Sequence, residues 1–204
     1  MKRALNINTA YSQEFDTFEF DGVWLDVFGE ATKTGVWIVY GAEKNGKSWF
    51  SLKLADYLSQ FLRTLYVSAE EGLDKEFVDA MKRARLDGNN KKLLFKEYEP
   101  LEELDQYLSK RQAPKICLFD NVTIYKDELS YGGFQEFARK HSDKLLIFIA
   151  HEERNEPYTA TAKMIKRLSK IIIRVQGLAC FISGRCPGGT LMIDENKARL
   201  YHGQ

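Results

Sequence analysis

One stretch of eight residues limits most strongly how this chain can fold. Gly41-Ala42-Glu43-Lys44-Asn45-Gly46-Lys47-Ser48 follows the apolar run 36–40 and leads into a helical pattern that begins at Trp49. The two glycines let the backbone curl, so that successive N–H groups point inward at phosphate oxygens. The helix that follows adds its positive N-terminal end. Apolar strand, loop and helix in this order predict a phosphate-binding loop, and the alternative is a glycine-rich turn beside an exposed lysine.

The spacing of this loop assigns a role to each of its polar side chains. Lys47 would reach the β- and γ-phosphates of bound ATP, and Ser48 would hold Mg²⁺. Asp120 ends the apolar strand 116–120 and is the second expected metal ligand, through water. The expected cofactor-binding residues are Gly41, Ala42, Glu43, Lys44, Asn45, Gly46, Lys47, Ser48 and Trp49.

Apolar runs alternate with helical patterns through most of the chain. The expected strands are 36–40, 64–69, 93–95, 116–120 and 145–150. Because these strands are apolar on both faces and are separated by helical patterns, the sequence predicts an α/β fold with a mostly parallel sheet covered on both sides. The later pairs 171–175 with 179–183 and 191–193 with 198–201 are too close for crossover helices, so we expect antiparallel hairpins.

The length and composition fit a single domain in a reducing compartment. The chain has 204 residues and a formal charge of +1, so a nucleic-acid surface would have to be local. The three cysteines have no metal or redox spacing, and no apolar stretch reaches membrane-spanning length. We therefore expect a cytoplasmic protein with no membrane partner. Residues 1–30 are rich in aromatic side chains. They are interpreted either as an edge element covering the core or as an arm that docks on a neighbouring subunit. Residues 31–204 are expected to form the main domain.

Ligands of parallel sheets bind beyond the carboxyl ends of the strands, where Glu70, Asp120 and His151 are expected. Asn121 follows Asp120, at a position where many P-loop hydrolases have a glutamate that polarises water. Glu70 is then the best candidate for the base, with Glu71 as a competitor, although either could be an ordinary acid at a helix N-terminus. His151 could sense the γ-phosphate or bond to Glu152 or Glu153. Two aromatic side chains, Tyr158 and Trp24, could stack on adenine, but core packing also suits both.

The ordered features together resemble the RecA-like P-loop ATPases, and most closely the ATPase domains of DnaB-type helicases and RadA-type proteins. The features are the phosphate-binding loop, Ser68-Ala69-Glu70-Glu71 and the strand tipped by Asp120. The segment 184–189 with 197–200 resembles the DnaB-type K-x-R-x-G-P-x-G stretch, so the resemblance implies that Arg185 is an arginine finger in a homo-oligomer. Its alternative is a solvated arginine at a hairpin tip. Ser183 stands where that family has a lysine, and His151 where it has glutamine.

A row of basic residues suggests a surface for single-stranded DNA. If the helix were continuous, one face would carry Lys163, Lys166, Arg167, Lys170 and Arg174. The alternative is a solvated face that ends where the strand at Ile171 starts. Three functions follow: an oligomeric ATPase linked to DNA, of helicase, recombinase or loader type; a P-loop kinase; and a nucleotide-binding assembly module with little turnover.

Overall fold

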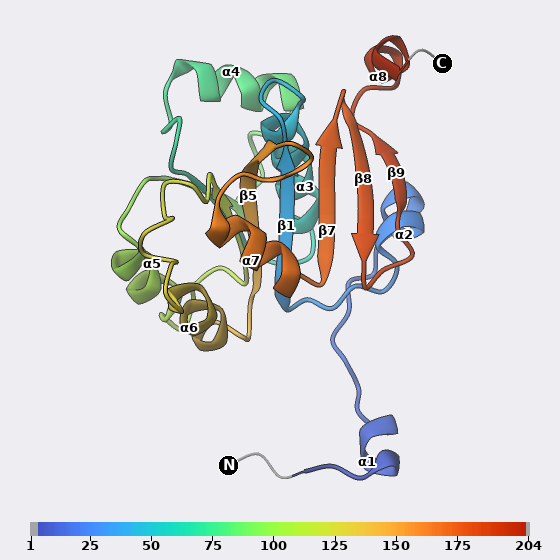
Figure 1. Cartoon of the computed structure of the whole chain (residues 1–204), viewed down its shortest axis with the longest axis vertical. Helices are drawn as coiled ribbons and strands as arrows, with labels where there is room; N and C mark the ends of the chain where they lie inside the picture. Colours follow the sequence, from blue (N-terminus) through green and yellow to red (C-terminus); the bar gives the residue numbers. More distant parts are fainter. Residues whose placement is uncertain (1–3, 203–204) are drawn as a thin grey trace.

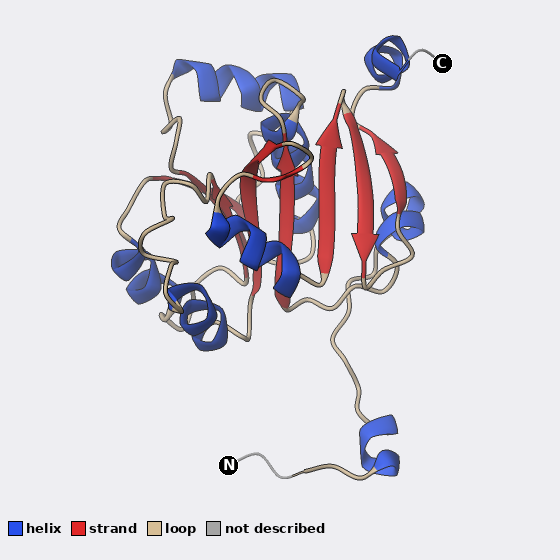
Figure 2. Ribbon diagram, in the orientation of Figure 1, coloured by secondary structure: helices blue, strands red, loops and turns tan. Residues whose placement is uncertain are grey.

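A computed structural model describes residues 4–202. The ends of the two predicted regions, residues 1–3 of 1–30 and residues 203–204 of 31–204, lie outside the described part. The strands form one sheet in the order β3-β2-β4-β5-β1-β7-β8-β9, with β6 paired to β5 (Figures 1 and 2). The strands are β1 (Gly35–Gly41), β2 (Thr64–Ser68), β3 (Leu93–Glu97), β4 (Ile116–Asp120), β5 (Leu145–Glu153), β6 (Glu156–Pro157), β7 (Ile171–Gln176), β8 (Ala179–Gly184) and β9 (Gly189–Met192). The helices are α1 (Ile7–Tyr11), α2 (Gly22–Phe28), α3 (Lys47–Ser59), α4 (Lys75–Ala84), α5 (Leu101–Leu108), α6 (Gly133–Lys140), α7 (Ala160–Leu168) and α8 (Glu195–His202).

The six strands β1–β5 and β7 run parallel to one another, as the alternation of strands and helices predicted. At the other edge, β8 pairs antiparallel with β7 and β9 pairs antiparallel with β8. The two-residue connection between β7 and β8 leaves no room for a helix, which explains the change of direction. The predicted α/β fold, with a mostly parallel sheet and C-terminal antiparallel strands, is confirmed.

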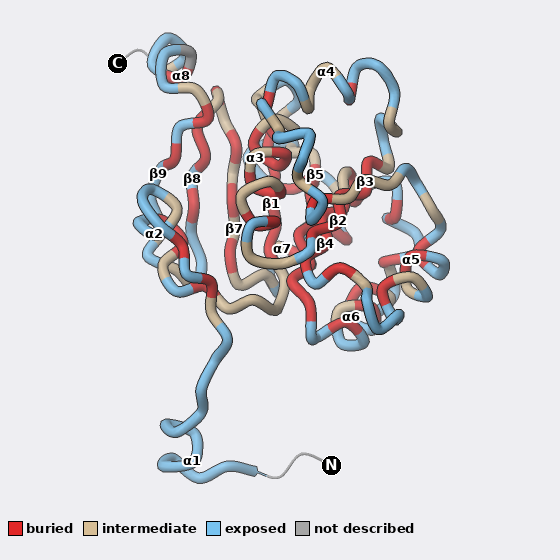
Figure 3. The backbone as a smooth tube through the Cα atoms, turned by 180° about the vertical axis from the view of Figure 1, so that it is seen from behind, coloured by how far each residue is buried: buried red, intermediate tan, exposed pale blue. Residues whose placement is uncertain are grey.

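Two apolar layers cover the two faces of the sheet, because successive side chains of a strand point to opposite faces. Trp37 of β1 packs in the layer that contains Phe50 of α3 and Phe77 of α4. The next residue, Ile38, packs in the opposite layer with Leu104 of α5, and α6 and α7 contribute to that layer too. Figure 3 shows the central strands as buried along nearly their whole length. None of the helices in residues 4–202 has the length and apolar character needed to span a lipid bilayer.

The aromatic N-terminal segment divides into a packed part and an outlying part. Phe18 and Phe20 are buried, with ring centroids 4.8 Å apart, and Trp24 of α2 stacks on Tyr57 of α3 at 4.6 Å. In the packed part the chain forms α2 and one isolated bridge between residues 17 and 32. Helix α1 stands away from the body of the molecule and is exposed throughout (Figures 1 and 3). The docking of such an arm on a neighbouring subunit remains a prediction.

The strand predicted at residues 198–201 is wrong, because these residues belong to helix α8. The Ala198 N–H donates to the Asp194 carbonyl at 2.9 Å, which starts the helical pattern. Glu195 lies in the first turn, where a negative charge favours the helix dipole. Strand β9 therefore pairs only with β8 along the described sheet, so the predicted hairpin of 191–193 with 198–201 is not formed, and β8 and β9 form an antiparallel hairpin that was not predicted.

The continuous basic helix face predicted for residues 163–174 is also wrong. Helix α7 ends at Leu168, because Ser169 is extended and the chain turns into β7. Lys170 lies between these elements and donates to the Thr34 carbonyl at 3.0 Å. Arg174 lies on β7 and makes two hydrogen bonds to the Glu152 carboxylate. Of the predicted set, Lys163, Lys166 and Arg167 remain together on α7.

Candidate nucleotide site

The predicted phosphate-binding loop lies between the end of β1 at Gly41 and the start of α3 at Lys47, two residues earlier than the helical pattern indicated. Lys44 and Gly46 have positive φ angles of 59° and 97°, so the backbone curls here before it enters the helix. Gly46 is the residue that caps α3. The loop therefore ends on the N-terminus of a helix of 13 residues, which favours an anion.

The parallel register brings the predicted acidic and polar residues to this loop. Gly41 lies opposite His151 on β5, and Ser68 at the end of β2 lies opposite Asp120 at the end of β4. Together with the loop they line a cavity of about 310 Å³. Its wall consists of Glu43, Lys44, Lys47, Ser48, Glu70, Glu71, Asp120, Asn121 and His151.

The Lys47 side chain is buried in this cavity and donates to the Ala42 carbonyl of its own loop at 2.8 Å. Burial lowers the pKa of Lys47, and the nearby carboxylates of Asp120 and Glu70 act against that shift. An ammonium group held by one carbonyl keeps two donors for other acceptors. Lys47 therefore has the position and the free donors needed to bind an anion in the loop.

Asp120 is half-buried at the end of β4, and its Oδ2 accepts a hydrogen bond of 2.5 Å from the Tyr66 hydroxyl. Burial raises the pKa of Asp120 to about 6, and the neighbouring Glu71 and Glu70 add to that shift, whereas the hydrogen bond from Tyr66 and the charge of Lys47 oppose it. A cation beside this carboxylate would offset the cost of its burial. The Ser48 hydroxyl and the Asp120 carboxylate are hard oxygen ligands, which fit Mg²⁺.

No group of three or more His, Cys, Asp or Glu side chains in residues 4–202 is arranged to hold a metal by itself. Mg²⁺ usually takes one or two protein ligands and completes its shell with water and substrate phosphates. The donor set at Ser48 and Asp120 therefore fits a metal ion that arrives with a nucleotide.

Glu70 is held by two neighbours. The Asn121 Nδ2 donates to Glu70 Oε2 at 2.8 Å, and the His151 Nε2 lies 3.3 Å from the same oxygen. The alternative pairing of His151 with Glu152 or Glu153 is wrong, because the His151 Nε2 lies beside Glu70. Glu152 binds Arg174 instead. Sequence reasoning missed the contact of Asn121 with Glu70, which only the adjacency of β2 and β4 creates.

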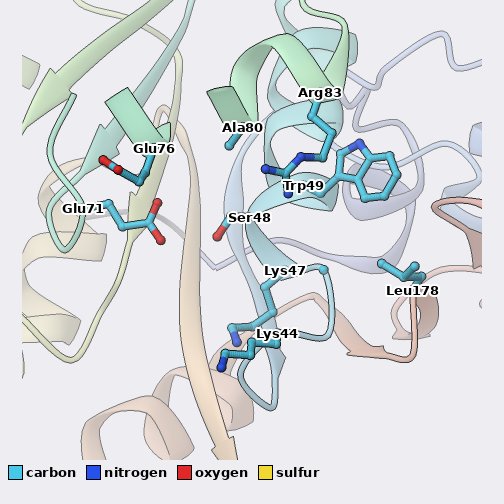
Figure 4. A pocket seen from close by; sticks show the side chains of 10 residues that line it. Lys44, Lys47, Ser48, Trp49, Glu71, Glu76, Ala80, Arg83 and Leu178 are labelled. Carbon is cyan, nitrogen blue, oxygen red and sulfur yellow. The ribbon is translucent and has the colours of Figure 1, made fainter. Parts of the chain in front are cut away.

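A second cavity of about 520 Å³ opens beside Ser48, which lines both cavities (Figure 4). The indole of Trp49 and the guanidinium of Arg83 both line it, with Leu178 at one side. The sequence analysis did not identify the contributions of α4, namely Glu76, Ala80 and Arg83. Their spacing of four and three residues puts them on one helix face, and that pattern is the signal that could have found them.

Neither aromatic residue suggested for adenine lines this cavity. Trp24 packs on Tyr57 in the apolar layer beside α3. Tyr158 is 57% exposed and its N–H donates to the His151 carbonyl. Trp49 is thus the tryptophan nearest to the predicted phosphate site, because it directly follows Ser48.

Arg185 lies at the opposite end of the sheet from the loop. Gly184 lies opposite Ile171, and Ile171 lies opposite Trp37 near the start of β1. The Arg185 N–H donates to the Lys170 carbonyl at 2.7 Å. Since a strand of seven residues spans about 20 Å, Arg185 is too far away to contact an anion in its own loop.

Comparisons with known proteins give the fold. No family model and no curated protein matches the chain. Among solved structures, the flagellar accessory protein FlaH from Methanocaldococcus jannaschii has a TM-score of 0.62 at 18% identity, over 86% of this chain and 91% of that chain. A second solved structure, described as an ATPase domain, has a TM-score of 0.59 at 14% identity, over 84% of this chain and 85% of that chain. The sheet order, the position of the loop and these structural neighbours together give the chain a RecA-like P-loop fold, the fold that it shares with these two proteins.

Proposed function

We propose that this protein binds ATP with Mg²⁺ and hydrolyses it as a homo-oligomer coupled to DNA. One observation carries the proposal: Lys47 and Ser48 face Glu70 and Asp120 across the same cavity of about 310 Å³. A cation donor, a hydroxyl and two carboxylates around a helix N-terminus are what a metal-bound triphosphate requires. The likeness of the fold to an ATPase domain supports the part of the proposal that concerns ATP.

In this site the triphosphate would lie along the loop, with its γ-phosphate toward Glu70. Lys47 would exchange its bond to the Ala42 carbonyl for the β- and γ-phosphates. Mg²⁺, held by Ser48 and through water by Asp120, would supply positive charge to the phosphate oxygens. The rest of the nucleotide would occupy the second cavity, where the flat groups of Trp49 and Arg83 suit stacking on a base.

Glu70 would accept the proton of the attacking water. The water oxygen forms a bond to the γ-phosphorus while the bond to the β-phosphate oxygen breaks, which releases ADP and inorganic phosphate. A positioned base contributes about 10²–10⁴-fold to such a step. Asn121 and His151 hold the Glu70 carboxylate at the edge of the cavity, and His151 lies where it could also contact the γ-phosphate.

A second candidate has a specific observation in its favour. Glu70 Oε2 already accepts a hydrogen bond from Asn121, and a base tied up in this way would leave water unactivated. The protein would then be a nucleotide-binding assembly module with little turnover. The release of phosphate in a single turnover separates the two functions.

The test compares ATP binding and phosphate release in four proteins. We expect calorimetry with Mg²⁺ and ATP to give binding in the wild type, and the Lys47→Ala protein to bind at least about 10-fold more weakly, because it loses charge-assisted hydrogen bonds. Glu70→Gln should keep binding and lose phosphate release. The control is Lys33→Ala, which removes a lysine paired with Asp16 far from the loop.

Absence of ATP binding by the wild type would overturn the proposed function. Binding without phosphate release would favour the assembly module instead. A phosphorylated acceptor in place of free phosphate would point to a kinase.

A further inference from the structure

Asn45 connects the phosphate-binding loop to the turn between β7 and β8. Its Oδ1 accepts from the Gly177 N–H at 2.7 Å, and its backbone carbonyl accepts from the Leu178 N–H at 3.2 Å. Its Nδ2 donates back to the Glu43 carbonyl within the loop at 3.0 Å. Asn45 thus fixes the loop internally and holds it against a turn that follows more than a hundred residues later in the chain.

The turn also packs on the loop through an apolar contact. A Cβ atom added to Gly46 would lie 2.6 Å from the Leu178 Cδ2, so the Leu178 side chain covers the last loop residue closely. Leu178 lines the second cavity beside Trp49 (Figure 4). A shift of the turn would therefore move a wall of the proposed nucleotide site and the backbone that curls around the phosphates.

Helix α8 lies on the outer side of the same turn (Figure 1). The Tyr201 ring covers Gly177 so closely that an added Cβ would lie 1.9 Å from Tyr201 Cδ1. The His202 Nε2 lies 3.2 Å from the Gln176 carbonyl and can donate to it. Among the side chains of α8 that the structure describes, none lines either of the two cavities beside the loop.

We propose that Asn45 is a positioning residue through which α8 and the β7–β8 turn hold the phosphate-binding loop in its binding conformation. The inference rests on the proposed binding of ATP at this loop. Ordering a loop costs conformational entropy, and a loop that is held beforehand no longer bears that cost when the ligand binds. Nucleotide affinity then depends on a helix that does not touch the nucleotide.

The first test removes the contact of α8 with the turn. Tyr201→Ala should weaken ATP binding about 3- to 10-fold, a loss of the size expected for one coupled contact. Leu200→Ala is the matched control, because Leu200 is on the same helix but 85% exposed. The control should bind ATP like the wild type.

The second test asks whether Asn45 transmits the effect. Asn45→Ala should weaken ATP binding about 10-fold, because it removes hydrogen bonds that hold the loop. Adding Tyr201→Ala to Asn45→Ala should then cause a smaller loss than Tyr201→Ala causes in the wild type, since the side-chain bond from Asn45 to the turn is already removed. Independent, additive losses in the double variant would overturn the role of Asn45 as the link.

A third readout needs no nucleotide and so separates this inference from the proposed function. Hydrogen exchange of the amides in residues 42–48 should be faster in Tyr201→Ala and Asn45→Ala than in the wild type, and unchanged in Leu200→Ala. If the wild type binds no ATP, the proposed function fails while the exchange data still test the coupling. If Tyr201→Ala changes neither exchange nor affinity, the inference is wrong.

Discussion

Gly41 has no room for any side chain, although its backbone angle is not one that only glycine adopts. A Cβ atom at this position would lie 2.2 Å from the carbonyl oxygen of Val175, the residue opposite it on β7. Backbone atoms within a sheet cannot move aside cheaply, so Gly41→Ala should lower the free energy of unfolding by about 1–3 kcal/mol. Denaturant unfolding measures this change.

The control for this substitution is Gly88→Ala. An added Cβ at Gly88 meets nothing within 4 Å, so its effect on the free energy of unfolding should stay within about 0.5 kcal/mol. Equal midpoints for Gly41→Ala and the wild type would contradict the close approach of β1 and β7. The glycine that begins the motif thus serves the sheet, whereas Gly46, with its φ of 97°, serves the curl of the loop.

At the level of elements, α7 carries the remaining candidate surface for nucleic acid. Lys163 and Arg167 are exposed on it, while Lys166 is paired with Glu156 at 2.8 Å. Removing both exposed charges, with Lys163→Ala and Arg167→Ala together, should weaken binding of single-stranded DNA. The slope of log affinity against log salt should also become shallower, by about 0.7 for each phosphate that the variant no longer neutralises.

The matched control for α7 removes two exposed charges elsewhere. Lys110→Ala with Arg111→Ala, just after α5, changes the net charge by the same amount. Fluorescence anisotropy across a salt series distinguishes the two surfaces. Equal losses of affinity in both double variants would show that only the overall charge matters, and the α7 surface would then be rejected.

Elements buried on both faces could be predicted from the sequence, because their apolar runs leave few alternatives. The strand that ends in Asp120 is an example of this kind, whereas the loop before Lys47 could be predicted from the spacing of its glycines, lysine and serine. The segment 198–201 could not be predicted, since a short amphipathic run at a sheet edge fits a strand or a helix equally well. The positions of Asn121, Arg83 and Leu178 in the site depend on which elements become neighbours, and local patterns do not contain that information.

At the scale of the whole molecule, the loop and Arg185 lie at opposite ends of the sheet. If both act on one nucleotide, they must come from different copies of the chain. The contact then joins one end of a protomer to the other end of the next, which is a head-to-tail interface that closes into a ring or continues as a filament. An arginine supplied in this way is worth about 10³–10⁵ in rate.

Mixing two inactive variants tests this arrangement, because a head-to-tail interface can combine the intact parts of each. Arg185→Ala retains the loop, and Lys47→Ala retains the arginine, so random assembly at equal amounts should restore ATP hydrolysis to about a quarter of the wild-type rate. Mixing Lys47→Ala with Asp120→Ala is the control, because every site then has a damaged loop side and no interface can recover. A mixture of Arg185→Ala and Lys47→Ala that stays inactive at every ratio would rule out the action of Arg185 on a neighbouring subunit. Recovery in the test mixture alone would mean that the catalytic site lies at the interface between protomers. Each protomer would then give its loop to one site and its Arg185 to the next.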